Sequence, residues 1–176
     1  MKKIIGWVLL LVGLLCASEL FAQTVSTRRY TIPALAFDYF QGTAQYLDNV
    51  GMVEGASTSP SLTGIGHVAL PGLAVAKSFT VCGQDNASDQ QFSATLFRKS
   101  TLVTDPPFTA PQLMAQVNSG VTFASTATVC PTATIPGSMA TVNNANWTYY
   151  VELTIGDTTT VIAARVTYTC TLGGTC

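Results

Sequence analysis

The chain has 176 residues, of which 48% are hydrophobic and only 10% are charged, and its formal net charge at pH 7 is −1. A weakly acidic chain without a basic stripe lacks the charge that binds nucleic acid or an anionic membrane surface, so both classes of partner are excluded. The length fits one domain that buries about two-thirds of its unfolded surface.

The first 22 residues, MKKIIGWVLLLVGLLCASELFA, have the order of a secretory signal peptide. Two lysines precede an apolar run over residues 4–15, and Ala22 is a small residue before a cleavage point. A retained N-terminal anchor is the alternative, but the apolar run is short for a membrane span. We therefore predict a signal peptide over 1–22 and a secreted or periplasmic domain over 23–176, with no membrane span after processing.

The strands expected along the chain follow from apolar and polar residues that alternate between turn residues. An edge strand is expected over 28–37, because Pro33 is tolerated only at an edge or a break. Residues 48–66 are rich in Gly, Ser and Thr and are expected to form a long loop. Residues 111–117 fit either one or two helical turns or a short strand, and we favour the strand. Further strands are predicted over 73–82, 91–99, 120–130, 146–155 and 160–170.

The last two of these segments have the cleanest alternation in the chain. The first places Tyr150 in its polar phase, and the second places Ile162 in its apolar phase, which should face the core. The connection over 156–159, GDTT, has the composition of a turn, so we predict a tight hairpin. Short strands at regular spacing predict an all-β chain folded as a single antiparallel β-sandwich or barrel.

Four of the five cysteines lie after the predicted cleavage point: Cys82, Cys130, Cys170 and Cys176. An even number in an exported chain favours two disulfides, for which three connectivities are open. Cys82 and Cys130 both lie opposite the core phase of their strands, and only TLGGT separates Cys170 from Cys176. We favour Cys82–Cys130 and Cys170–Cys176. With no C-x-x-C motif and a single histidine, zinc binding and thiol redox chemistry are not predicted.

Four blocks in fixed order resemble a pattern in secreted bacterial β-sandwich proteins of uncharacterised function. They are HVALPGLAVAKSFTVCGQDNASDQQFSATLFRKS, MAQVNSG, TIPGSMATVNNANWTYYVELTI and VIAARVTY, which fall within residues 65–169. The resemblance implies a jelly-roll-like β-sandwich of exported proteins. It implies no catalytic residue and no ligand.

The loop GQDNASD carries oxygen ligands that suit calcium, namely Asp85, Asn86 and Asp89. Calcium needs six or more oxygens, and the same residues form ordinary turns without an ion. We therefore predict a turn and no cofactor, with calcium as the alternative.

Catalytic candidates are few. The single histidine, His67, has no G-x-S-x-G nucleophile elbow in the chain to work with. Glu152 and Asp38 are candidate carboxylates for glycoside hydrolysis. The simpler alternative for Glu152 is an ion pair with a basic residue on a neighbouring strand: Arg98, Lys99 or Arg165. No catalytic residue is assigned, and we predict a non-enzymatic protein.

Aromatic side chains are the remaining candidates, because their faces stack on sugar rings. Tyr39, Phe40, Tyr46 and Tyr150 are candidate ligand-binding residues, whereas Trp147 is in phase with the core. The sequence thus favours a binding or adhesion module for a glycan or another cell-surface or matrix component. A structural subunit of an extracellular assembly is the alternative, suggested by low charge and abundant Thr, Ser and Ala, and a glycoside hydrolase is a further one.

Overall fold

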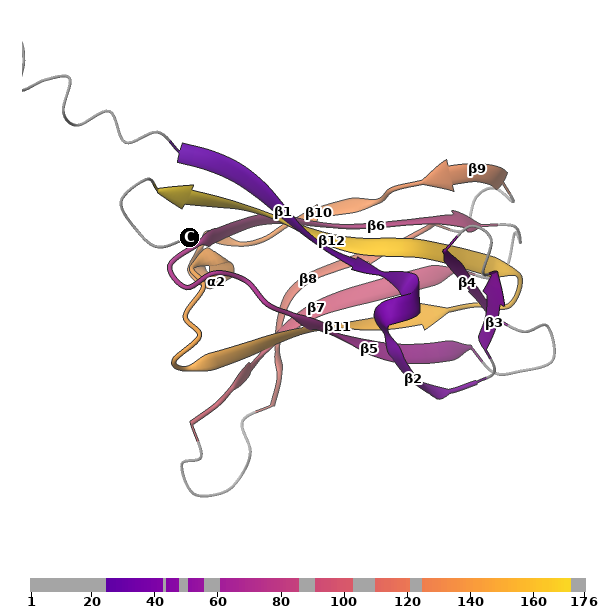
Figure 1. The fold of residues 1–176 in the computed structure, drawn as a ribbon, viewed down its shortest axis with the longest axis horizontal. Helices are drawn as coiled ribbons and strands as arrows, with labels where there is room; N and C mark the ends of the chain where they lie inside the picture. Colours follow the sequence, from indigo (N-terminus) through magenta and orange to yellow (C-terminus); the bar gives the residue numbers. More distant parts are fainter. Residues whose placement is uncertain are drawn as a thin grey trace, which may run out of the picture.

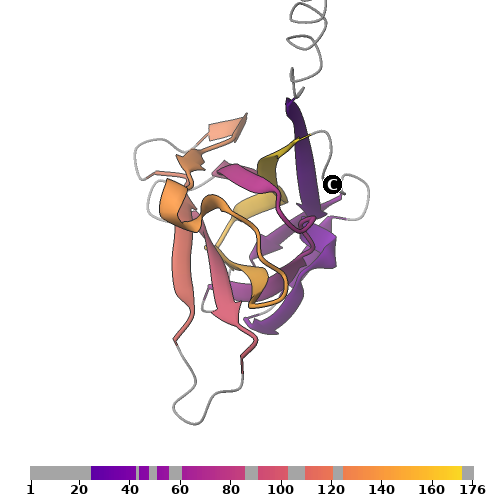
Figure 2. The same ribbon diagram turned by 90° about the vertical axis from the view of Figure 1, so that its left-hand side faces the viewer.

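Two antiparallel sheets face each other in the computed structural model of the protein (Figures 1 and 2). The structure describes residues 25–42, 44–47, 51–55, 61–85, 91–102, 110–120 and 125–171, without the side chains of 44–47, 125–126 and 171. The predicted signal peptide over 1–22 and Cys176 lie outside these residues. No helix in the described part of the chain is long and apolar enough to cross a membrane.

One sheet has seven strands and the other has five. The seven-stranded sheet contains β1 (Val25–Pro33), β3 (Ala44–Leu47), β4 (Met52–Gly55), β6 (Val75–Asp85), β9 (Ser125–Val129), β10 (Thr132–Thr134) and β12 (Thr159–Thr171). The five-stranded sheet contains β2 (Asp38–Gln41), β5 (Leu62–Val68), β7 (Phe92–Ser100), β8 (Gln112–Asn118) and β11 (Trp147–Ile155). Two short helices, η1 (Ala34–Ala36) and α2 (Gly137–Ala140), lie between strands.

The connectivity is that of a jelly roll. In one sheet the neighbours run β1, β12, β6 and β10, and in the other they run β5, β11, β7 and β8. The chain passes repeatedly from one sheet to the other, as in an eight-stranded jelly roll of two Greek keys. The predicted all-β antiparallel sandwich with jelly-roll character is therefore confirmed.

The predicted hairpin between the last two strands is wrong. Only three residues separate β11 from β12, yet the two strands belong to different sheets. Thr158 takes a positive φ of 57°, and the Gly156 amide donates a hydrogen bond to the Gln91 carbonyl at 2.9 Å, so the chain turns between the layers. Both strands bury one apolar face, and these faces meet across the core instead of lying side by side.

Ile162 does not face the core as predicted. The register of β12 with β6 shifts between Val161 and Ala163, which marks a β-bulge. Val161 is fully buried, whereas Ile162 is half-buried. An extra residue in a bulge reverses the alternation that follows it, so the bulge moves the core phase by one position.

The predicted loop over 48–66 contains β4 and most of β5, so that prediction is also wrong. Gly64 and Gly66 are strand residues covered by aromatic rings. A Cβ on Gly64 would lie 2.6 Å from Cδ1 of Tyr39, and one on Gly66 would lie 2.8 Å from Cε1 of Phe37. These glycines indicate a loop in the sequence, but in the structure they make room for rings from a neighbouring part of the chain.

The other predicted strands are found. β6, β7, β8 and β9 overlap the four ranges predicted for them, and residues 111–117 form a strand rather than a helix. β1 pairs only with β12, and Pro33 is its last residue, as expected for an edge strand.

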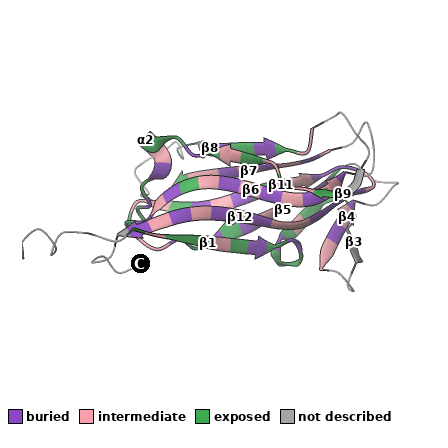
Figure 3. Cartoon of the chain, turned by 90° about the horizontal axis from the view of Figure 1, so that it is seen from above, coloured by how far each residue is buried: buried purple, intermediate pink, exposed green. Residues whose placement is uncertain are grey.

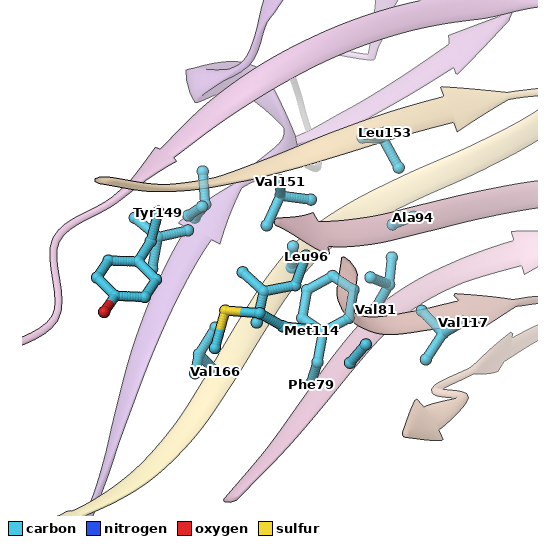
Figure 4. Close-up of a cluster of buried hydrophobic side chains, with 14 of the residues drawn as sticks. Phe79, Val81, Ala94, Leu96, Met114, Val117, Tyr149, Val151, Leu153 and Val166 are labelled. Carbon is cyan, nitrogen blue, oxygen red and sulfur yellow. The ribbon is translucent and has the colours of Figure 1, made fainter. Parts of the chain in front are cut away.

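The core lies between the sheets, and along the central strands buried residues alternate with more exposed ones (Figure 3). Its central side chains come from both layers (Figure 4) and include Phe79, Val81, Leu96, Met114, Val151 and Val166. Burying each large apolar side chain contributes about 1.5–3 kcal/mol.

The disulfide between Cys82 and Cys130 is confirmed, with a Cα–Cα distance of 4.2 Å. It joins β6 to the residue that follows β9. Cys170 is disulfide-bonded as well. Its predicted partner, Cys176, lies outside the described residues, so that pairing stays a prediction.

Candidate binding surface on the five-stranded sheet

Four side chains form a row across the outer face of the five-stranded sheet. His67 pairs with Tyr150, Tyr150 pairs with Phe97, and Phe97 pairs with Leu113, so the row crosses β5, β11, β7 and β8. Directly paired residues in an antiparallel sheet point to the same side. We call His67, Tyr150, Phe97 and Leu113 the aromatic row.

The centre of the row is a stacked pair of rings. The centroids of Phe97 and Tyr150 are 5.4 Å apart, and the ring planes differ by 27°. Both side chains are half-buried, whereas their chain neighbours Leu96 and Tyr149 are buried in the core. Alternation along β7 and β11 thus brings the two rings to the surface, where stacking contributes about 0.5–1.5 kcal/mol beyond burial.

A β-bulge in β8 extends the row. Leu96 pairs with Ala115, but Phe97 pairs with Leu113, so Met114 is an extra residue on β8. Met114 and Ala115 are both buried, and Leu113 is 49% exposed. The bulge therefore aims Leu113 outward beside Phe97, a known use of such irregularities.

Polar side chains lie in the next row of the same face. Glu152 pairs with Ile65 of β5, and Ile65 pairs with Asp38 of β2, so the two carboxylates flank one half-buried isoleucine. Both acidic side chains are exposed. Neighbouring strands are about 4.8 Å apart, which places the two backbones about 10 Å from each other.

The ion pair predicted for Glu152 is wrong for two of its three candidates. Arg98 has the alternation phase of buried Leu96 and so lies on the inner side of the sheet, whereas Glu152 lies on the outer side. Arg165 belongs to β12 of the other sheet. Lys99 shares the outer face but pairs with Thr148, four residues along β11 from Glu152.

The environment of Tyr150 favours its neutral hydroxyl. Burial raises the pKa of Tyr150 above its usual 10.0, and the negative charge of Glu152 raises that pKa further. The hydroxyl therefore keeps its proton through the physiological pH range and serves as both hydrogen-bond donor and acceptor.

The four aromatic residues predicted to bind ligand lie in different places. Tyr150 is in the aromatic row. Tyr39 points to the inner side, where its ring packs over Gly64 and its hydroxyl donates to the Ala34 carbonyl at 2.8 Å. Phe40 is 63% exposed on β2, and Tyr46 belongs to β3 of the other sheet, with its side chain outside the described set.

The sequence did not indicate Phe97, Leu113 or His67 as binding residues. Phe97 could have been found from the alternation along β7. Ala94 and Leu96 lie in the apolar phase of this strand, so Phe97 falls in the polar phase. Leu113 could not, because it reaches the row only through the bulge in β8.

Of the three candidate calcium ligands, only Asp85 lies within the described residues. Asp85 is 3% exposed, and its Oδ2 accepts a hydrogen bond from Ser119 Oγ at 2.6 Å. Its Oδ1 is buried without a hydrogen-bond partner among the residues that the structure describes. The described residues contain no group of three or more His, Cys, Asp or Glu that could hold a metal. Asn86 and Asp89 lie outside the description, so calcium binding here stays an untested alternative.

Comparison with known proteins finds similarity in structure only: no family model and no curated protein sequence matches the chain. The C-terminal CBM6 of the laminarinase LamC from Zobellia galactanivorans aligns with a TM-score of 0.48 and 9% identity, over 79% of this chain and 98% of that one. The xylan-binding module CBM15 aligns with a TM-score of 0.44 and 12% identity, over 88% and 100%. A structure of infectious bursal disease virus, Gx strain, aligns with a TM-score of 0.40 and 16% identity, over 85% and 33%. Each of these alignments is a similarity of structure at low sequence identity.

Proposed function

We propose that the protein is an exported, non-enzymatic binding module that recognises a glycan through the aromatic row. The stacked Phe97–Tyr150 pair on the outer face is the observation that carries this proposal. Two rings beside an exposed leucine form an apolar strip about three strands wide, which suits the C–H face of a sugar ring.

The polar row supports the same ligand class. Asp38 and Glu152 are hydrogen-bond acceptors, and Gln116, which pairs with Thr95 in this row, both donates and accepts. Together with the Tyr150 hydroxyl, these groups match the many hydroxyls of a saccharide. An apolar strip bordered by a few polar groups is the usual composition of a ligand site.

Titration calorimetry against a panel of neutral polysaccharides, including a β-glucan and a xylan, tests the proposal. Tyr150→Ala and Phe97→Ala should each weaken binding about tenfold, equivalent to about 1.4 kcal/mol, because each removes one stacking surface. Leu35→Ala is the matched control, since Leu35 is an exposed apolar residue in η1 outside the row, and it should leave the affinity unchanged.

Three outcomes would overturn the proposal. The first is binding that neither ring substitution weakens. The second is release of reducing sugars during incubation, which would favour a glycoside hydrolase. The third is concentration-dependent polymers in electron micrographs without saturable glycan binding, which would favour a subunit of an extracellular assembly.

A further inference from the structure

The outer face of the seven-stranded sheet carries two rows of polar side chains that cross β1, β12, β6 and β10. Ile32, Phe79 and Val166 are buried in the core, so the alternate residues of their strands point outward. One row is Arg29, Thr167, Ser78 and Thr134, and the other is Thr31, Arg165, Thr80 and Thr132. All of these side chains are exposed or half-buried. Neither row contains a carboxylate or a large apolar side chain.

Arg29 and Arg165 are diagonal neighbours on this face. Arg29 pairs with Thr167 of β12, and Arg165 precedes Thr167 by two residues on the same side of that strand. Diagonal neighbours on an antiparallel sheet are about 7–8 Å apart, which is within reach of long side chains. The two positive charges therefore repel each other, and an anion bound between them removes that repulsion.

A β-bulge adds a third positive charge. Lys77 is the extra residue of β6 between Ala76 and Ser78, where the register with β12 shifts. Ala76 is fully buried, whereas Lys77 is exposed, so the bulge turns Lys77 outward beside Ser78. Ser78 pairs with Thr167 on the side opposite Arg29, so basic residues from three adjacent strands surround Thr167. We call Arg29, Lys77 and Arg165 the basic cluster.

The acidic residues in the described part of the chain lie away from the basic cluster. Asp38 and Glu152 are on the outer face of the opposite sheet. The other three are at the far end of β12, where Glu54 pairs with Thr160, Asp85 pairs with Thr159 and Asp157 precedes the strand. Thr160 is five residues from Arg165, or about 17 Å along the strand. The formal net charge of −1 thus conceals a local group of positive charges on this face.

The basic cluster has the chemistry that binds oxygen anions. A guanidinium presents a planar fork of donors that matches the oxygens of a sulfate or a carboxylate, and a lysine adds a point charge. The hydroxyls in the two rows donate and accept hydrogen bonds, as the hydroxyls of a saccharide do. Anionic groups along a sugar chain therefore fit this mixture of charges and hydroxyls.

Other classes of partner fit the face less well. Anionic lipid surfaces are bound by about four to eight clustered basic residues, or by an apolar face that enters the bilayer. Protein interfaces are centred on aromatic or other apolar anchors. The cluster has three basic residues, and the two rows contain no such anchor. Nucleic acid binding depends on many phosphate contacts, which exceed what three basic residues supply.

We propose that the outer face of the seven-stranded sheet is a second binding surface, for an acidic polysaccharide whose sulfate or carboxylate groups bind the basic cluster. The aromatic row lies on the outer face of the opposite sheet, so each surface has its own ligand and neither depends on the other. A protein with both surfaces would bridge two polysaccharide chains, one on each side of the sandwich.

Two pairs of polymers are the probes, because the members of each pair differ only in their anionic groups. They are dextran sulfate with dextran, and polygalacturonate with its methyl ester. In titration calorimetry at low salt, the wild-type protein should bind at least one acid about tenfold or more tightly than its neutral counterpart, in line with charge-assisted hydrogen bonds. The acid that binds more tightly identifies the anionic group. Equal affinity for acid and neutral polymer in both pairs would overturn the proposal.

Substitutions on the two faces locate the site. Arg29→Gln and Arg165→Gln should each weaken binding of the acid about tenfold, and Thr167→Val, which keeps every charge, should weaken it about threefold by loss of one hydroxyl. Lys99→Gln is the charge-matched control, since Lys99 is exposed on the outer face of the opposite sheet. An equal loss in Lys99→Gln would overturn the proposal in favour of general charge. Arg29→Gln, on an edge strand, serves as the test if Arg165→Gln does not fold.

Phe97→Ala separates this proposal from the proposed function, because it should leave binding of the acid unchanged. Loss of the acid in Phe97→Ala would place the anion at the aromatic row and overturn the second surface. Binding of the acid that is lost in Arg29→Gln, without binding of any neutral polysaccharide, would support the second surface and overturn the proposed function. Tighter binding to phosphatidylglycerol vesicles than to either acid, also lost in Arg29→Gln, would overturn a polysaccharide in favour of a membrane.

Discussion

Tyr39 and Tyr150 lie on opposite sides of the same sheet and have different roles. Tyr39 fills the space above Gly64 and bonds the Ala34 carbonyl, so its ring and its hydroxyl are both engaged within the protein. Tyr150 stacks on Phe97 at the surface. Strand register decides which side of the sheet each tyrosine faces, and the sequence alone does not distinguish the two.

Substitution of Gly64 tests whether the ring of Tyr39 needs that space. We expect Gly64→Ala to lower the free energy of unfolding by about 1–3 kcal/mol, because the new methyl would lie 2.6 Å from a ring atom that the Tyr39 hydroxyl bond holds in place. Urea denaturation measures the change. Gly137→Ala is the control, since nothing lies within 4 Å of its added methyl, and a loss of equal size there would show that the ring is not the cause.

The raised pKa of Tyr150 makes stability depend on pH in the alkaline range. In the unfolded chain this tyrosine loses its proton near pH 10, whereas in the folded protein the proton is held to higher pH. The free energy of unfolding should therefore be unaffected below that pH and should fall as the pH rises through the interval between the two pKa values. Because the chain has six tyrosines, the difference in tyrosinate absorbance between the wild-type protein and Tyr150→Phe during ultraviolet titration measures the pKa of Tyr150.

Glu152→Gln should lower the pKa of Tyr150 without returning it to 10.0, because burial is the larger cause and remains in the variant. A pKa of 10.0 in the wild-type protein would show that neither burial nor the charge of Glu152 disfavours the tyrosinate.

At the scale of strands, the sequence predicted which segments are extended better than where they pair. β11 alternates without interruption, so the polar phase of Tyr150 was predicted correctly, and its chain neighbours Tyr149 and Val151 are buried. Alternation reports that a strand has one buried face and says nothing about which sheet it joins. A tight turn after β11 fits a hairpin and a crossing between layers equally well, and only the packing of two apolar faces decides between them.

The β-bulges, and the aromatic rings that pack over Gly64 and Gly66, also could not be predicted from the sequence. The bulges at Val161 and at Met114 each shift the alternation by one residue, and neither position has a composition that marks it. Gly64 and Gly66 have the composition of a loop, because the rings that replace their side chains come from β2 and the segment before it.

The disulfide between Cys82 and Cys130 should be a large contributor to stability. It closes a loop with a sequence separation of 48, for which the chain-entropy model gives about 4 kcal/mol. The double variant Cys82→Ser with Cys130→Ser should lose about that amount in urea denaturation. Reductant is unsuitable for this measurement, because Cys170 is also disulfide-bonded. A loss below about 1 kcal/mol would mean that the sheets hold these positions together without the bond.

For the molecule as a whole, one residue of the aromatic row was predicted from the sequence. Tyr150 could be assigned to a polar phase, but its neighbours His67, Phe97 and Leu113 come from strands far apart in the chain. A row across a sheet depends on strand order and register, which are properties of the whole fold. Arg98 was expected in a surface ion pair, and its place on the inner side beside Trp147 again depends on register.

The position of β12 has a consequence for how the chain folds. This last described strand lies between β6 on one side and β1 and β4 on the other, with Val25 opposite Thr171. During synthesis, β1, β4 and β6 therefore wait for a neighbour that is made after all of them. Contacts between such distant residues close slowly, and the unpaired edges are exposed to other chains in the meantime. The seven-stranded sheet should therefore close late, only once β12 has been made.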